Sequence, residues 1–207
     1  MLNAKELLEY SKIIPVISVE SSDDMLHLAD ALIEGGLDIF EITLRTPAAI
    51  EALRETVKRF PQAIVGAGTV LDSESFKAIE QSGAKFAISP GLSDSLAKIV
   101  DESNIPLIPG VATASEIMIA REYGFKELKL FPATSVGGVD TLKSFGNVFP
   151  DVTFCPTGGI NIDNAKSFLS LKNVSCIGGS WICNPTFVKY QKFYEITKLT
   201  KEALETL

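Results

Sequence analysis

Residues 38–45 read DIFEITLR, and apolar and polar side chains alternate along most of this stretch. Successive side chains of a β-strand point to opposite faces, so the stretch predicts a strand with two unlike faces. The apolar face would comprise Phe40, Ile42 and Leu44. Glu41, Thr43 and Arg45 would share the other face. The pattern therefore predicts a strand that packs under helices on one side and carries charged groups on the other.

Short apolar, β-branched runs of this kind recur along the chain, with helix-like stretches between them. We predict strands at 13–19, 38–44, 63–67, 85–89, 105–109, 127–131, 152–156 and 174–178. Their centres lie about 20 to 25 residues apart, the length of one strand, one short helix and two tight loops. Most of the runs lack a clean alternation, as is usual for parallel strands that are covered on both faces.

Eight strand–helix units predict an α/β fold of the (β/α)8 TIM-barrel type, with flanking helices near residues 3–12 and 186–206. The 207 residues lie near the lower end of the roughly 200 to 400 residues usual for this fold. We expect a single domain over residues 1–207. An open doubly wound sheet is the alternative, but no GxGxxG motif follows the first predicted strand.

Helix ends are marked by familiar residues. Thr46 followed by Pro47 is typical of a capping residue before a first-turn proline. The spacing of Thr113 and Glu116 predicts a capping box. Left-handed helix C-caps are expected at Gly35, Gly83 and Gly124.

The composition excludes several classes of protein. The net charge is −7, from 26 acidic and 19 basic residues, which argues against a nucleic-acid partner or a basic membrane-surface protein. The N-terminal residues 1–12 contain no signal-peptide core, and the longest apolar runs are too short to span a membrane. Three scattered cysteines, Cys155, Cys176 and Cys183, predict buried reduced thiols. We therefore expect a cytoplasmic protein.

A single histidine, His27, lies in a helical pattern and is expected to be an ordinary helix residue. One histidine rules out histidine triads and zinc sites that use two or more histidines. We expect neither a metal nor another cofactor.

Two charges fall where a buried strand should have none. In residues 127–132, ELKLFP, Lys129 and Phe131 would point into the barrel, as Glu41 does from its own strand. A buried ion pair is one explanation, although such pairs often contribute little net stability. The other is catalytic: apolar surroundings and a second cation at Arg45 favour a neutral amine, which can form a Schiff base with a ketone. Glu41 could then transfer protons.

Glycine-rich turns follow the last two predicted strands. Residues 157–160 read TGGI and residues 178–180 read GGS. In a TIM barrel the loops after strands seven and eight are the usual phosphate site, where glycines let backbone N–H groups converge on an anion. Together the two turns predict a phosphate site. The small loops at 66–69 and 89–91 are either plain turns or further substrate contacts.

Seven motifs in order resemble the KDPG/KHG aldolases, from Ile14 to about Trp181. These are EITLRT (41–46), GAGTVL (66–71), FAISPGL (86–92), IPLIPGV (105–111), KLFPA (129–133), FCPTGGI (154–160) and CIGGSW (176–181). The resemblance implies an enzyme that cleaves 2-keto-3-deoxy-6-phosphogluconate (KDPG) and, in some members, 4-hydroxy-2-oxoglutarate (KHG). It also implies a metal-independent, cytoplasmic protein that is typically a homotrimer.

The resemblance also implies residue roles. Lys129 would be the Schiff-base lysine and Glu41 the acid/base group. The remaining expected sites are Arg45 and Thr69 for a carboxylate, Pro90 and Phe131 as pocket walls, and Thr157, Gly158, Gly159, Gly179 and Ser180 at the phosphate end. The chain departs from the family at Thr134, where better-known members carry glutamate, and this leaves the preference among related keto acids open.

Alternative functions remain at this stage. Another phosphosugar barrel enzyme, such as an isomerase or epimerase, would share the phosphate site, and an aldolase for the galactonate-type epimer would share the lysine. A metal-dependent aldolase is disfavoured by the single histidine. A barrel retained as a binding module is disfavoured because Lys129, Glu41 and Arg45 are all present.

Overall fold

The computed structural model describes residues 2–207, so Met1 of the expected domain 1–207 lies outside the described residues. The strands are β1 (Ile13–Ile17), β2 (Ile39–Thr43), β3 (Ile64–Gly68), β4 (Ala87–Ile88), β5 (Leu107–Ile108), β6 (Gly110–Val111), β7 (Glu127–Leu130), β8 (Thr153–Phe154) and β9 (Ile177–Gly179). The helices are α1 (Ala4–Tyr10), α2 (Ser22–Glu34), α3 (Ala49–Arg59), α4 (Ser73–Gln81), α5 (Asp94–Val100), α6 (Ala114–Glu122), α7 (Gly138–Val148), α8 (Ile162–Leu169), α9 (Pro185–Lys189) and α10 (Phe193–Thr206). Each predicted strand overlaps an observed one.

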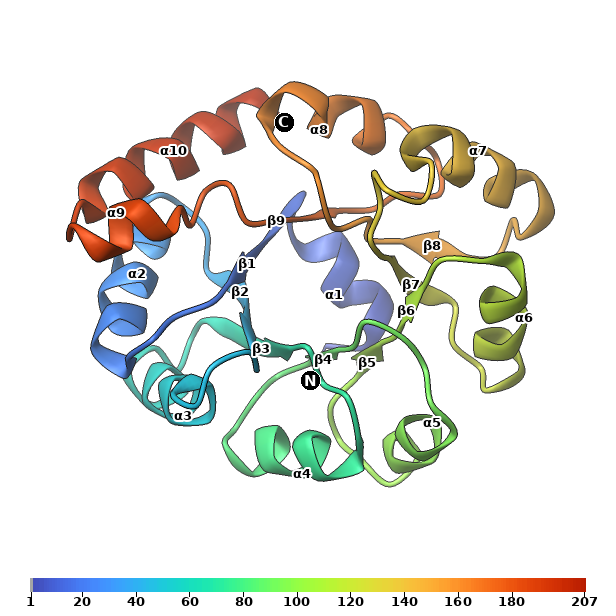
Figure 1. Cartoon of the computed structure of the whole chain (residues 1–207), viewed down its shortest axis with the longest axis horizontal. Helices are drawn as coiled ribbons and strands as arrows, with labels where there is room; N and C mark the ends of the chain where they lie inside the picture. Colours follow the sequence, from blue (N-terminus) through green and yellow to red (C-terminus); the bar gives the residue numbers. More distant parts are fainter. Residues whose placement is uncertain (1) are drawn as a thin grey trace.

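The strands form a curled parallel sheet with helices on its outer face (Figure 1). Six strands follow the order β5-β4-β3-β2-β1-β9, and three more follow the order β6-β7-β8. In a doubly wound sheet the connecting helices cover both faces. Here they lie outside, and α1 lies on the inner side of the curl, so the doubly wound alternative is wrong.

The fifth predicted strand, 105–109, ends early and is followed by a strand that was not predicted. β5 pairs with β4, whereas β6 pairs with β7 on the other side. Pro109 lies between them and has no N–H to donate to a ladder. Its carbonyl still accepts from the Lys129 N–H at 2.9 Å, so the chain changes its pairing partner at the proline.

The core has an outer and an inner layer. Phe40, Ile42, Leu128 and Leu130 belong to the outer layer, between the sheet and the helices, as the alternation predicted. The inner layer contains Leu7, Leu8, Ile14, Ile39, Phe86, Ile88, Ile108, Cys155 and Cys176. Because Ile14 and Ile39 come from the starts of their strands, α1 packs into the amino-terminal end of the curl. α1 begins with a capping box between Asn3 and Glu6.

Three predicted helix ends are correct in full. Thr113 caps α6, and its N–H donates back to the Glu116 carboxylate at 2.9 Å. Gly83 and Gly124 take the left-handed conformation, with φ of +87° and +86°.

Two others are wrong. Gly35 is right-handed at φ −72°, because the helical turn continues through it, and Gly36 takes the left-handed conformation instead. Thr46 does not cap α3, which begins at Ala49 without a side-chain cap. The Thr46 hydroxyl donates instead to the Val19 carbonyl at 2.6 Å.

The predicted C-terminal helix 186–206 is divided into α9 and α10. Gln191 lies between them with φ +53°, a left-handed conformation that a right-handed helix cannot include.

His27 lies in α2, as expected, with its ring 5.2 Å from that of Phe193. The three cysteines are free and buried, and burial raises the pKa of the Cys183 thiol. No helix within residues 2–207 combines the length and the apolar character that a membrane span requires.

Candidate active site

The two unexpected charges meet inside the curl of the sheet. Lys129 on β7 and Glu41 on β2 are 88 residues apart in sequence, and the lysine Nζ donates to the glutamate Oε1 at 3.4 Å. Their side chains are only 6% and 2% exposed. The neighbours of Lys129 on its strand, Leu128 and Leu130, point outward into the helix layer. Strand alternation therefore directs both charged groups to the inner face.

The Phe131 ring and the Gly68 backbone pack closely around this ion pair. The Lys129 Nζ lies 5.3 Å from the centre of the Phe131 ring, an arrangement that favours a cation. A Cβ atom at Gly68 of β3 would collide with the Glu41 carboxylate, so only glycine leaves room for it. Removing two charges from water is costly, and the attraction between Lys129 and Glu41 offsets part of that cost.

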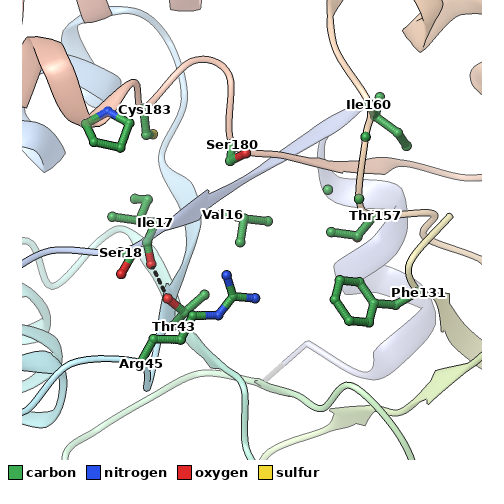
Figure 2. Close-up of a pocket in the computed structure, with 14 residues that line it drawn as sticks. Val16, Ile17, Ser18, Thr43, Arg45, Phe131, Thr157, Ile160, Ser180 and Cys183 are labelled. Carbon is green, nitrogen blue, oxygen red and sulfur yellow. Dashed lines mark hydrogen bonds between the residues drawn. The ribbon is translucent and has the colours of Figure 1, made fainter. Parts of the chain in front are cut away.

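A pocket of about 280 Å³ opens at the carboxyl ends of the strands (Figure 2). Thr43 and Arg45 line one side of it, and Phe131 and Thr157 line the other. Thr43 follows Glu41 by two residues on the inner face of β2, and Phe131, directly after the end of β7, follows Lys129 by two residues. The ion pair therefore lies one layer of side chains deeper than these pocket walls.

Arg45 is the exposed cation of the pocket, and its guanidinium points toward the pocket's middle (Figure 2). Its Nε donates to the Thr69 hydroxyl at 3.1 Å. Thr69 has φ +58°, a left-handed conformation that is uncommon for a β-branched residue and often occurs at functional sites. The structure thus brings the two expected carboxylate-binding residues together.

The expected phosphate end is only partly assembled as predicted. Thr157, Gly158, Gly159 and Ser180 line the pocket, and both glycines have positive φ. Gly179 does not line it, because its Cα faces the Trp181 ring closely enough that a Cβ would collide with the ring.

Pro90 also lies apart from this pocket. It lines a separate hollow with Val70 and Leu71, between the loops that follow β3 and β4.

Sequence reasoning missed several pocket residues. Ser18, Cys183 and Pro185 line the pocket. Ser18 directly follows β1, so the rule that functional residues lie beyond the carboxyl ends of barrel strands could have found it. Cys183 and Pro185 carry no comparable signal, because a loop brings them back over the sheet.

Thr134, the departure from the family pattern, lies beside the glycine turn. Its N–H donates to the Gly158 carbonyl at 3.1 Å, and a Cβ on Gly159 would collide with its side chain. The residue at this position therefore helps to shape the expected phosphate end.

Among residues 2–207, no three His, Cys, Asp or Glu side chains come together as metal ligands would.

The fold and the site define an α/β enzyme whose pocket lies at the carboxyl ends of parallel strands, above a buried lysine–glutamate pair. A family model described as KDPG and KHG aldolase matches residues 4–199. The KHG/KDPG aldolase of Escherichia coli (strain K12) is 45% identical over 203 residues, which cover 98% of this chain and 95% of the relative. The chain therefore belongs to the KDPG and KHG aldolase family, and it is an aldolase, a carbon–carbon lyase.

Two further comparisons agree. The 2-dehydro-3-deoxy-phosphogluconate aldolase of Pseudomonas aeruginosa is 44% identical over 195 residues, which cover 94% of this chain and 89% of the relative. A crystal structure of KDPG aldolase from Legionella pneumophila holds pyruvate captured at low pH as a covalent carbinolamine intermediate. It matches this structure with a TM-score of 0.95 and 44% identity, and the match covers 97% of this chain and 98% of that one.

Proposed function

We propose that this chain cleaves KDPG to pyruvate and D-glyceraldehyde 3-phosphate through a Schiff base on Lys129, and that it also cleaves KHG to pyruvate and glyoxylate. The observation that carries the proposal is the buried Lys129 Nζ, 3.4 Å from the Glu41 carboxylate and below the pocket. The names of the relatives and the carbinolamine in the Legionella pneumophila structure support it.

The hydrogen bond between Lys129 and Glu41 provides the route for the first proton transfer. A proton that moves from the ammonium to the carboxylate leaves a neutral amine, which attacks the C2 carbonyl of the substrate. Glu41 then returns this proton to the carbinolamine oxygen and transfers a second one to it from the amine nitrogen, so that the oxygen leaves as water and the iminium ion remains.

The same carboxylate serves the cleavage step. Glu41 takes the proton of the C4 hydroxyl as the C3–C4 bond breaks, and the bonding electrons move into the iminium to form an enamine. The aldehyde leaves, Glu41 protonates C3, and water releases pyruvate from Lys129. Each proton that Glu41 gives away it has first accepted, so one carboxylate is sufficient.

The polar walls of the pocket suit the two ends of the substrate. Arg45 and Thr69 bind the carboxylate beside C2, since a guanidinium pairs well with a carboxylate. The 157–159 turn and Ser180 bind the phosphate, with Gly179 shaping the second turn. Phe131 acts as an apolar wall.

Borohydride trapping tests the proposal. Incubation with pyruvate and borohydride should leave a stable adduct on Lys129, located by peptide mass analysis. Lys129→Ala should abolish both the adduct and cleavage, because the electron sink is lost. Lys126→Ala is the matched control at an exposed lysine three residues away, and it should keep both. An adduct at Lys126 or Lys143, or cleavage without an adduct as a metal-dependent aldolase would give, overturns the proposal.

Substrate preference is a separate question, because Thr134 lies against the turn that would bind the phosphate. A pyruvate-release assay on KDPG, its galactonate-type epimer and KHG, side by side, ranks the three substrates. We expect KDPG to be cleaved best.

We also infer that the two sheets are parts of one closed (β/α)8 barrel within a single domain, 1–207. The chain runs directly from β5 into β6, and bridges at Phe154–Val174 and Thr157–Gly178 span the gap between β8 and β9. We also propose a homotrimer in the cytoplasm, which the family resemblance supports, and sedimentation measurements would test the trimer.

A further inference from the structure

The turn that carries Arg45 begins where β2 ends, at Thr43. Backbone pairing between β1 and β2 stops at Ile17 and Ile42, so the ladder with β1 does not extend to this turn. A long arginine side chain has many rotamers, and the backbone position decides which of them reach the pocket. Another attachment must hold the turn on its β1 side.

Two threonine hydroxyls provide that attachment, and they flank Arg45 in the sequence. The Thr43 hydroxyl is buried and donates to the Ile17 carbonyl at 2.8 Å, as Figure 2 shows. The Thr46 hydroxyl donates to the Val19 carbonyl at 2.6 Å. Together they continue the attachment of β2 to the β1 segment beyond the last backbone pair.

The remaining contacts of the turn direct the guanidinium. The Arg45 N–H donates to the Thr43 carbonyl at 2.8 Å, and the Arg45 Nε donates to the Thr69 hydroxyl at 3.1 Å. Nε is one of five N–H donors of the guanidinium, so four others are left for an anion in the pocket. With the turn attached to β1 through Thr43 and to Val19, just beyond β1, through Thr46, these donors face the pocket (Figure 2).

We infer that Thr43 and Thr46 are positioning residues for Arg45, which hold its guanidinium where the carboxylate of a 2-keto acid binds. The inference rests on the proposed function, in which Arg45 binds that carboxylate. Loss of the hydroxyls leaves Lys129 and Glu41 in place, so substrate binding weakens more than the chemical steps.

The test is the double variant Thr43→Val/Thr46→Val in the full chain. Its KM for pyruvate, measured in the condensation with D-glyceraldehyde 3-phosphate, should rise about tenfold, since each neutral hydrogen bond lost is worth a severalfold change. Its kcat should stay within about twofold. Thr43→Ser/Thr46→Ser keeps both hydroxyls and should restore the KM. If the double variant does not fold, Thr46→Val alone, at a half-buried position, should raise KM severalfold.

Thr56→Val is the matched control. Thr56 is buried in α3, and its hydroxyl donates to the Ala52 carbonyl at 2.6 Å, so the same change costs a comparable bond away from the pocket. It should lower stability and leave KM unchanged. An unchanged KM in the Thr43 and Thr46 variants, or an equal rise in Thr56→Val, overturns the inference.

A double-mutant cycle separates the inference from the proposed function. Arg45→Gln should raise the KM for pyruvate by itself, and the threonine changes should add little to it, because they act through the missing guanidinium. Additive effects overturn the inference while the proposed function stands. An unchanged KM in Arg45→Gln removes the carboxylate role of Arg45, and the inference fails with it.

Discussion

The two ends of the space inside the curled sheet are built from the same strands and differ completely in chemistry. At the amino end, Ile39 of β2 packs with Leu7 and Leu8 of α1 in an apolar cluster. Two residues further along β2, on the same face, Glu41 meets Lys129. One step of the strand period therefore separates an apolar end from a polar site. We expect the apolar end to contribute mainly to stability and the polar end mainly to catalysis.

The energetics of the two ends explain this division. Each large apolar side chain buried at the amino end stabilises the fold by about 1.5–3 kcal/mol. The ion pair at the other end contributes little net stability, because desolvation offsets much of the attraction. Substitutions at the polar end should change activity first, and substitutions at the apolar end should change stability first.

The sharpest test of the polar end is Glu41→Gln. Losing the proton acceptor should lower kcat by roughly 10²–10⁴-fold, the usual effect of a positioned general acid/base. Pyruvate affinity should change much less, because Arg45 and Thr69 are untouched. Steady-state turnover and the half-saturation of pyruvate trapping measure the two effects. A fall in kcat of less than about tenfold would mean that Glu41 is structural.

The matching test of the apolar end is Leu8→Ala. Leu8 is fully buried, and the cavity left behind should lower the free energy of unfolding by about 2–5 kcal/mol. Urea denaturation measures the loss, and kcat at a temperature where the variant is folded should stay within about threefold. Leu71→Ala, at a side chain 60% exposed, should cost about 0.5 kcal/mol or less. A large fall in kcat in Leu8→Ala would mean that the apolar end also supports the chemistry at the polar end, against the division proposed above.

Ser180→Asp changes the pocket without touching the ion pair. Losing a donor to a charged group is worth about 1.5–3 kcal/mol, and the new charge repels the phosphate, so kcat/KM for KDPG should fall at least ~10- to 100-fold. KHG carries a single negative charge at that end and should lose less. Ser167→Asp adds the same charge on exposed α8 and serves as the control. Equal losses for both substrates would indicate general damage to the fold, and no loss for either would place the anion elsewhere.

The smallest effect is expected at the rim of the amino end, at Asp151. Arg121 donates to its carboxylate at 3.0 Å and holds the pKa of Asp151 below its ordinary value of 3.8. The pair should therefore stabilise the fold above that ordinary pKa and cease to do so as the pH falls through the lowered one. Asp151→Asn should lower Tm slightly near neutral pH and leave it unchanged in acid. A Tm difference that persists in acid would exclude the ion pair as its cause.

The local sequence pattern was sufficient to predict part of this structure. The two-residue period of residues 38–45 and 127–132 determined which side chains face inward, because a strand alternates its faces whatever its partners are. The glycine turns, the Thr113 capping box and the positions of the eight strand-like runs are likewise consequences of short-range geometry. These features, with the motifs they carry, were enough to indicate the family and to select Lys129 and Glu41.

Other features were decided by contacts between distant segments. Thr46 could have capped a helix, but the Val19 carbonyl lies within reach of its hydroxyl. Gly35 faces Thr200 of α10, where a Cβ would collide, and the left-handed turn falls at Gly36. Neither partner can be read from the residues around the glycine or the threonine.

The site follows the same division. The sequence by itself determined that a lysine and a glutamate would face inward from two strands. Only the tertiary structure decided that they lie 3.4 Å apart across 88 residues, that Thr69 adopts a left-handed conformation beside Arg45, and that Ser18 and Cys183 reach the same pocket. The physical reason is that side-chain direction depends on the local backbone, whereas the distance between two strands depends on how the whole sheet curls and packs.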